Sequence, residues 1–294
     1  MPFAEAHRAR LYFEDTGRGS PIVLVHEFAG DLRSWEPQVR ALSRRHRCVT
    51  FNARGYPPSD VPDDPGVYSQ MVAADDIAAV LRAGNLGPAH LVGCSMGSFA
   101  ALHLALRQPQ AVRSLVLVGC GYGERADQRE AWRADARRLA ALFESAGSKA
   151  AADEYALGPY RLQLQAKDPR GWSEFAGRLA EHSAAGAALT LRGVQEARPP
   201  LREFQSGLER MELPVLLIVG DEDEPCLEVN LWLKRTIPRA GLAIVPRTGH
   251  TVNLEEPDTF NTLVQGFVAA VEAGHWEPRD PRTMGESSVF QQDE

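Results

Sequence analysis

The chain has 294 residues, 44% of them hydrophobic and 24% charged, so it can bury one large core or two modest ones and is not a disordered segment. Its formal net charge is -7 and its longest basic run is SRRHR at Ser43 to Arg47, which argues against nucleic acid as a partner. The N-terminus lacks the apolar run of a signal peptide, and no stretch of about 18 apolar residues occurs, so we expect neither export nor a membrane partner.

The cysteines also indicate a protein that is not exported. The four cysteines lie far apart, with no C-x-x-C pair and no histidine at zinc-finger spacing: Cys48, Cys94, Cys120 and Cys226. Free thiols in a reducing cytoplasm fit this pattern best.

The first segments in chain order predict a hairpin that feeds a buried strand. Residues Ala9 to Glu14 alternate weakly, Thr16 to Ser20 form a glycine-rich turn, and Ile22 to Val25 are a continuous apolar run.

Short apolar runs then alternate with amphipathic segments along most of the chain. Strands are predicted at Cys48 to Phe51, His90 to Cys94, Ser114 to Gly119, Pro214 to Gly220 and Leu242 to Pro246, and helices at Trp35 to Arg44, Tyr68 to Arg82, after Ser95, after Gly220 and after Pro246. This alternation predicts an α/β fold with a mostly parallel central sheet and helices on both faces.

The rhythm stops between Gly121 and Leu213, where the chain is rich in alanine and in charges of both signs. Helical stretches at Ala126 to Ser145 and Trp172 to Gln195 predict a helical cap insertion over the carboxyl ends of the strands, where ligands bind in open α/β sheets. We therefore expect a core formed by residues 1–120 and 214–275, an insertion at 121–213, and a peripheral polar tail at 276–294. Most aromatic residues of the insertion are expected to pack it rather than line a pocket: Trp132, Phe143, Tyr155, Tyr160, Trp172 and Phe175.

The strongest chemical signal is Gly93-Cys94-Ser95-Met96-Gly97, a G-x-S-x-G sequence with an apolar strand before it and a helix after it. A serine hydroxyl becomes a good nucleophile when a tight turn exposes it beside a base, and the flanking glycines let strand and helix approach closely enough to form that turn. The alternative is a turn in which Ser95 only caps the helix. The strand and helix on either side favour the nucleophile.

A base and an acid must come from later in the chain. His250 follows a glycine between the last strand and the last helix, although a packed loop histidine is the alternative. The acid is expected after the strand ending at Gly220, where Asp221, Glu222 and Asp223 are candidates for orienting the imidazole. Glu222 would point the other way in an extended loop.

The order of strand, G-x-S-x-G, helix, helical insertion, "GDED" and "GH" resembles the α/β-hydrolase superfamily over roughly Ala9 to Ala273. The resemblance implies that the acid is the second carboxylate of the G-[DE]-x-D turn, Asp223. It also implies an oxyanion hole formed by the backbone N–H groups of Met96 and Phe28. The stretch NARGYPPSD from Asn52 is similar to a structural turn of the family, with Asn52 in place of Asp.

One residue departs from the family pattern in the oxyanion loop. His26-Glu27 stands where His-Gly is common, and both residues are candidates for tuning the site. Phe28 can still donate its backbone N–H, so the hole survives the change. A Glu27 carboxylate that points to solvent or to a basic partner is tolerated, whereas one that points into the site opposes a developing oxyanion.

The resemblance implies a serine hydrolase that cleaves carboxylic esters or lactones of a small molecule through an acyl-enzyme. No metal or organic cofactor is expected, because the sequence has no clustered metal ligands and no G-x-G-x-x-G after a strand. Alternatives are a C–C bond hydrolase or a cofactor-free peroxidase-like enzyme on the same triad, and a slow-turnover receptor-like binding protein. Whether the chain forms a homo-oligomer stays open.

Overall fold

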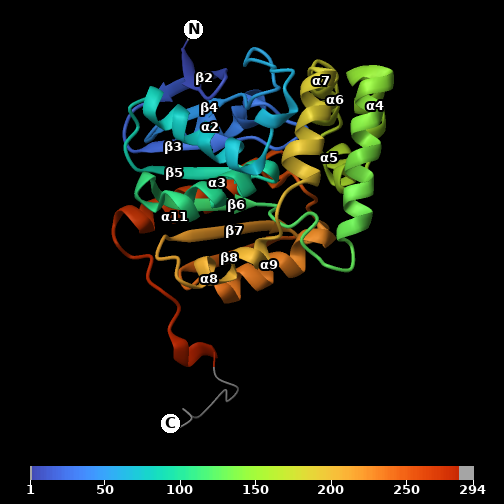
Figure 1. Ribbon diagram of the computed structural model, residues 1–294. Helices are drawn as coiled ribbons and strands as arrows, with labels where there is room; N and C mark the ends of the chain where they lie inside the picture. The colour runs from blue at the N-terminus through green and yellow to red at the C-terminus, as the bar shows by residue number, and fades with distance from the viewer. Residues whose placement is uncertain (1, 285–294) are drawn as a thin grey trace.

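The computed structural model describes residues 2–284, and its centre is an eight-stranded sheet in the order β1-β2-β4-β3-β5-β6-β7-β8 (Figure 1). The strands are β1 (Phe3–Ala6), β2 (Ala9–Gly17), β3 (Pro21–Val25), β4 (Arg47–Phe51), β5 (Ala89–Cys94), β6 (Val112–Val118), β7 (Val215–Gly220) and β8 (Ala240–Val245). From β4 to β8 all neighbouring strands are parallel, whereas β2 runs antiparallel to both β1 and β4. The α/β class predicted from the sequence is confirmed.

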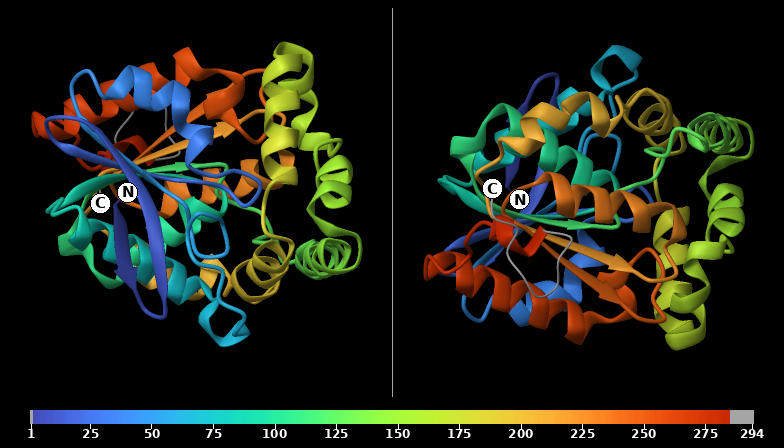
Figure 2. Two further views of the ribbon diagram at one scale, coloured as in Figure 1. Left: turned by 90° about the horizontal axis from the view of Figure 1, so that it is seen from above. Right: turned by 90° about the horizontal axis from the view of Figure 1, so that it is seen from below.

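Helices cover both faces of this sheet (Figure 2). One face carries α2 (Gln70–Ala83), α3 (Met96–Arg107), α8 (Gln205–Glu209) and α9 (Glu224–Thr236), and the other carries α1 (Glu36–Leu42), α10 (Val252–Glu255) and α11 (Pro257–Glu272). Each face has its own buried core: Ile77, Phe99 and Leu233 belong to the first, Trp35 and Phe260 to the second. The central strands are therefore apolar on both faces, which explains their continuous apolar runs.

Short 3-10 helices complete the elements outside the insertion: η1 (Leu32–Trp35), η2 (Pro65–Val67), η3 (Pro109–Ala111), η6 (Leu201–Phe204) and η7 (Pro281–Met284).

The predicted hairpin is wrong in its pairing. β2 and β3 follow one another in the chain, but β4 lies between them in the sheet, and the antiparallel partners of β2 are β1 and β4. The cause is burial: Ile22, Val23 and Leu24 are all fully buried, so β3 needs a neighbour on each side. The alternating pattern of β2 suits a position closer to the edge of the sheet.

The helices inserted between β6 and β7 stand across the carboxyl ends of the strands (Figure 1). They are α4 (Arg129–Tyr155), η4 (Pro159–Arg161), α5 (Leu162–Lys167), α6 (Pro169–Ala180), α7 (Ala184–Thr190) and a π-helical stretch, η5 (Leu191–Glu196). The backbone of α4 breaks at Gly147, whose φ is 82°. The stretch predicted as one helix from Trp172 to Gln195 is divided, because the Ser183 side chain accepts the Gly186 N–H and starts α7 as a new helix.

Arg198 joins the two segments that connect the insertion to the sheet. Its buried guanidinium stacks 3.4 Å from the Phe99 ring centroid, donates to the Tyr122 carbonyl oxygen at 2.5 Å, and lies 3.9 Å from Glu124 Oε1. Glu124 Oε2 in turn accepts the Leu201 N–H at 2.6 Å. The outgoing and returning segments are therefore tied together beside α3.

The first part of the predicted tail is anchored rather than peripheral. The Trp276 ring packs edge-on against Phe267 with centroids 4.6 Å apart, and its indole N–H donates to the Arg239 carbonyl oxygen at 2.8 Å. An aromatic ring among polar residues was enough to attach this segment to the second core. The remainder of the predicted tail, 285–294, lies outside the described residues. Across residues 2–284, none of the helices has both the length and the apolar character that a bilayer crossing requires.

Gly97 provides a test of the packing that joins α3 to β3. A β-carbon at this position would lie 2.2 Å from the Val25 carbonyl oxygen, a backbone atom that cannot move aside. We therefore expect Gly97→Ala to lower the free energy of unfolding by about 2 kcal/mol or more, as overpacking of a rigid contact does. Chemical unfolding monitored by tryptophan fluorescence measures this change.

Gly177→Ala is the matched control, because no atom lies within 4 Å of a β-carbon at this helical position. It should stabilise the protein by roughly 0.5 to 1 kcal/mol. Equal stability of the two variants would contradict the proposed close contact at Gly97.

Candidate active site

Ser95 occupies the turn between β5 and α3 with φ 49° and ψ -113°, a left-handed conformation rare for a residue with a side chain. Its own N–H donates to the Val118 carbonyl oxygen at 2.8 Å, and the Ser98 hydroxyl donates to the Gly93 carbonyl oxygen at 2.6 Å. These bonds hold the turn in the strained form. The Ser95 side chain does not cap α3, which removes the alternative role considered for it.

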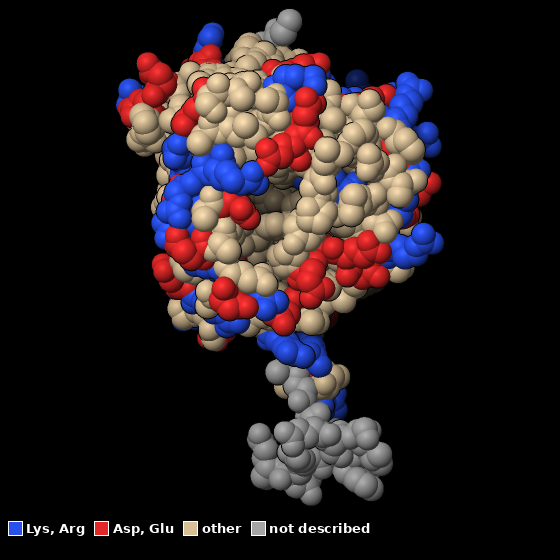
Figure 3. Space-filling model, turned by 90° about the vertical axis from the view of Figure 1, so that its right-hand side faces the viewer, with Lys and Arg blue, Asp and Glu red and all other residues tan. Residues whose placement is uncertain are grey.

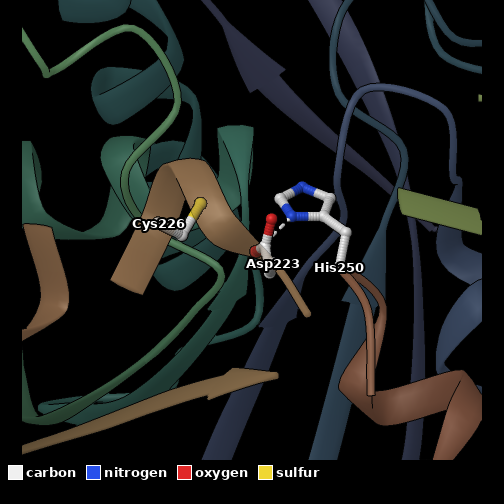
Figure 4. Close-up of side chains that lie close together, drawn as sticks. All are labelled: Asp223, Cys226 and His250. Atoms are coloured by element: carbon white, nitrogen blue, oxygen red, sulfur yellow. Dashed lines mark hydrogen bonds and ion pairs between the residues drawn. The ribbon is translucent and has the colours of Figure 1, made fainter. Parts of the chain in front are cut away.

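His250 and Asp223 meet at the ends of β8 and β7 (Figure 4). His250 Nδ1 and Asp223 Oδ2 are 2.7 Å apart, and both side chains are buried. With Nδ1 donating its hydrogen to the carboxylate, Nε2 keeps a lone pair and can accept a proton. This is the arrangement of a general base and the acid that orients it.

The other two carboxylates of the loop have different partners. Asp221 Oδ1 accepts the Thr248 N–H at 3.1 Å, and Glu222 Oε2 accepts a hydrogen bond from Gln163 at 2.7 Å. The structure therefore brings Asp223, rather than Asp221 or Glu222, to the imidazole.

Gly119 makes room for the imidazole and carboxylate. A β-carbon there would lie 3.0 Å from His250 Nδ1 and 3.3 Å from Asp223 Oδ2, and its φ is 54°. The Tyr122 ring packs edge-on against the imidazole with centroids 4.8 Å apart. The His250 ring is thus fixed by packing as well as by its hydrogen bond.

Cys226 lies beside this pair (Figure 4), and Asp223, Cys226 and His250 offer potential ligand atoms within 4.8 Å of one another. The donor set fits a metal poorly. His250 Nδ1 and Asp223 Oδ2 are hydrogen-bonded to each other, and the Cys226 thiol donates to the Gly119 carbonyl oxygen at 3.4 Å. Burial, together with the nearby Asp223 carboxylate, raises the pKa of the Cys226 thiol well above its ordinary value, so the thiolate that binds metals is disfavoured.

Neighbouring groups fix the direction of the Phe28 N–H, the predicted oxyanion donor. The Glu27 carbonyl, which belongs to the same peptide unit, accepts hydrogen bonds from His26 Nδ1 at 2.7 Å and from the Gly30 N–H at 3.2 Å. The two ends of a planar peptide point in opposite directions, so the Phe28 N–H faces away from that turn. The Phe28 carbonyl is held as well, by the Tyr56 hydroxyl at 2.8 Å.

The second predicted donor, Met96, is the first residue of α3. Its amide N–H has no acceptor within the helix, as is general for the first turn, and is free to bind a ligand there.

His26 acts through its neutral form. The Ala53 N–H donates to His26 Nε2 at 3.0 Å, so Nε2 accepts and Nδ1 carries the hydrogen given to the Glu27 carbonyl. Burial lowers the pKa of His26 to about 4. Through these two hydrogen bonds the His26 ring links the loop after β4 to the predicted oxyanion loop.

Glu27 pairs with a basic residue of the insertion. Its Oε2 accepts a hydrogen bond from Arg161 Nη2 at 2.6 Å, and the two side chains are 4% and 3% exposed. Arg161 could not be predicted as the partner, because the two residues are 134 positions apart and no local pattern marks the arginine. An acidic residue at a position where glycine is common in the family was the available signal that a buried partner should exist.

A pocket of about 260 Å³ lies between the sheet and the insertion, and both Ser95 and His250 line it. The other lining residues are mainly aromatic and apolar, with charged residues among them: Phe28, Tyr122, Trp132, Asp135, Ala136, Arg138, Leu139, Glu154, Tyr155, Gly158, Pro159, Tyr160, Arg161, Leu191 and Gln195. Figure 3 shows a hollow on the face formed by the insertion, with charged side chains of both signs around it. Of the six aromatic residues considered in the insertion, Trp132, Tyr155 and Tyr160 line the pocket, Phe143 and Phe175 are buried in the packing, and Trp172 packs against that cluster partly buried.

The sequence model of the alpha/beta hydrolase fold family matches residues 20–257, and the chain belongs to this family. It is an enzyme of the α/β-hydrolase type.

Among its relatives is a protein of Azorhizobium caulinodans named as a carbamate hydrolase, RutD, which is 30% identical over 92% of this chain and 100% of that protein. The 2-hydroxymuconate semialdehyde hydrolase of Pseudomonas putida is 30% identical over 92% of this chain and 94% of its own length. A thermophilic esterase from Thermogutta terrifontis, solved with malate bound, superposes with a TM-score of 0.79 at 27% identity, covering 90% of this chain and 94% of that structure.

The lowered pKa of the buried His26 ring leads us to predict that the stability of the protein depends on pH. Because the pKa of His26 is about 4 when folded and about 6.5 when unfolded, the unfolded chain binds more protons between these values. The contribution of neutral His26 is therefore fully present above pH 6.5 and is lost as pH falls toward 4, by roughly 3 kcal/mol. His26→Asn has a side chain too short to place an acceptor where Nε2 meets the Ala53 N–H, so it should be less stable than wild type by about 1 to 2 kcal/mol at pH 7.5.

This deficit should shrink or reverse at pH 4.5, as measured by urea unfolding at both pH values. His275→Asn, which removes an exposed ring, is the control and should follow the wild type. A His26→Asn deficit that stays constant across this range would rule out a buried neutral imidazole at position 26.

Proposed function

We propose that this α/β hydrolase is a serine hydrolase that transfers the acyl group of a small carboxylic ester or lactone to water. The supporting observation is that Ser95, in its strained turn, and His250 line the same pocket, and that His250 is hydrogen-bonded to the buried Asp223. Backbone strain at a serine that lines a pocket persists only where the surrounding structure enforces it, and such residues cluster at active sites.

In the proposed mechanism, Ser95 Oγ attacks the carbonyl carbon while His250 Nε2 takes the hydroxyl proton. The C–O bond to the leaving alcohol then breaks, the imidazolium returns the proton to that alcohol, and the acyl group stays on Ser95. Water repeats the attack with His250 as base, which releases the acid and restores the serine. Asp223 stabilises the imidazolium in both halves, and the Phe28 and Met96 N–H groups receive the oxyanion.

The pocket favours small substrates. Its volume of about 260 Å³ lies below the usual range for drug-sized ligands, and its aromatic walls suit an apolar acyl or alcohol group. The similarity to a solved esterase over most of both chains supports ester cleavage.

C–C bond hydrolysis is the second candidate, because a relative that is 30% identical is named 2-hydroxymuconate semialdehyde hydrolase. An activity panel separates the two: p-nitrophenyl esters and lactones of graded acyl length against β-diketones and vinylogous 1,5-diketones. Turnover of short esters or lactones with no cleavage of the diketones supports the first proposal, and the reverse supports the second.

Replacement of the nucleophile gives the direct test. Ser95→Ala should lower kcat for p-nitrophenyl acetate by about 10³-fold or more and abolish labelling by a fluorophosphonate, because no other group supplies the attacking oxygen. Ser206→Ala, which removes an exposed hydroxyl on α8, is the control and should retain wild-type rates. Wild-type turnover by Ser95→Ala would end the assignment.

A further inference from the structure

Two consecutive residues of the η4 turn contact the two catalytic loops. The Tyr160 carbonyl oxygen accepts the His250 N–H at 3.3 Å, and the Arg161 side chain binds Glu27 in the oxyanion loop. The approach of Tyr160 depends on Gly249, where a β-carbon would lie 2.6 Å from the same carbonyl oxygen. One turn of the insertion thus contacts both the base loop and the loop of the proposed oxyanion donor.

The neighbouring helix α5 is attached to the same region of the sheet. Gln163 donates to Glu222 at 2.7 Å, beside the proposed acid, and Lys167 donates to Glu256 at 2.6 Å, just after the base loop. The position of η4 is therefore fixed relative to the catalytic loops by contacts on its C-terminal side.

The Glu27–Arg161 pair is far more buried than the ion pairs on the surface of the insertion. Such a pair is costly, since both charges leave water, and it persists only with good geometry. Arg161 also lies 4.8 Å from the Phe175 ring centroid and 5.3 Å from that of Tyr155, so its charge is stabilised by aromatic faces. Tyr155 accepts a second hydrogen bond from Nη2 at 3.2 Å.

The insertion also holds the side chain of Phe28 itself. The Phe28 ring packs edge-on against Tyr155 and Phe143, with centroids 6.0 and 6.1 Å apart. The residue before the proposed oxyanion donor is thus held by charge, and the donor residue is held by aromatic packing.

We propose that Arg161 is a positioning residue: through Glu27 and the η4 turn, the insertion sets the geometry of the oxyanion loop and the base loop together. This inference rests on the proposed function. Arg161 also neutralises a carboxylate that would otherwise oppose negative charge developing on the substrate oxygen. Its loss should therefore lower kcat more than it changes KM, because the oxyanion exists in the transition state and not in the bound ester.

A direct substrate contact by Arg161 is the competing role. Arg161 is among the residues that line the pocket, but its side chain is only 3% exposed, and Nη1 is buried without a hydrogen-bond partner among the described residues. Anchoring of a substrate carboxylate would affect only anionic substrates, whereas positioning affects neutral and anionic esters alike.

The test uses Arg161→Met, Glu27→Gln and the double variant, with Arg161→Lys as the conservative rescue. Each single variant leaves one buried charge without its partner and should lower the Tm by roughly 10 °C. The double variant removes both charges and should recover most of the Tm, so it decides the outcome even if a single variant fails to fold.

We expect the kcat of the double variant for neutral p-nitrophenyl esters to stay at least about tenfold below wild type, with KM changed less than about threefold, because a misplaced oxyanion donor costs on the order of 10² in rate. Arg161→Lys should regain part of the lost kcat.

The control is the pair Arg192 and Glu144, an exposed ion pair of the insertion with a closest N–O distance of 2.8 Å. Arg192→Met with Glu144→Gln should leave both kcat and Tm near wild type. A Glu27→Gln, Arg161→Met double variant with wild-type kcat at wild-type Tm would reduce the pair to a structural contact and overturn the proposal. So would a loss of rate confined to carboxylate-bearing esters.

Hydrogen exchange separates this proposal from the proposed function. In the double variant, amide exchange measured by mass spectrometry should quicken in peptides covering residues 24–30 and 248–252, but not in the control. If exchange is quicker in the double variant but the wild type cleaves no ester, the coupling of the two loops stands and the proposed ester hydrolase activity is rejected. Unchanged exchange in an active esterase would reject the coupling alone.

Discussion

The contact of Gly97 with the end of β3 is the constraint on which the site depends. A side chain at position 97 would strike the Val25 carbonyl oxygen, so only glycine lets α3 approach the strand that leads into the oxyanion loop. That approach forces the chain through a tight turn at Ser95, which accounts for its positive φ. The same geometry brings Met96, at the start of α3, close to the end of the strand that leads to Phe28. A packing requirement between two secondary structures thus assembles the proposed nucleophile and the proposed oxyanion donors at once.

The proposed base is assembled by a different principle. Asp223 and His250 come from the ends of neighbouring parallel strands, so the sheet brings them together although 27 residues separate them in the chain. Their hydrogen bond is the only one that the structure shows for the Asp223 carboxylate within residues 2–284, since Oδ1 is buried without a partner. This bond orients the imidazole ring, which is the role that the proposed mechanism gives to Asp223.

The sequence indicated those parts of the site that follow strands. Ser95, Asp223 and His250 each come within a few residues after an apolar run, and parallel strands end at a common edge, so local pattern was sufficient to predict them as candidates. The position of β4 between β2 and β3 was not predictable from adjacent segments, because a turn rich in glycine looks the same whether or not the strands beside it pair. Arg161 escaped detection for a related reason. Its role depends on Glu27, which only the folded chain places nearby, and an arginine on a short helical turn is ordinary in an exposed loop.

The buried pair bears on how a substrate reaches Ser95. If the whole insertion lifted from the sheet, Glu27 and Arg161 would separate. Each such movement would cost free energy, because two buried charges would lose their partners. The contacts of Tyr160 with the base loop and of Arg198 with the returning segment would break in the same motion. By contrast, Arg138 and Glu154 line the same pocket from the two halves of α4, and both are largely exposed. A solvent-exposed ion pair opens at little cost, and the helix is already interrupted between them at Gly147. Access by local movement within α4 would therefore leave the proposed catalytic loops in place, whereas movement of η4 would disassemble them.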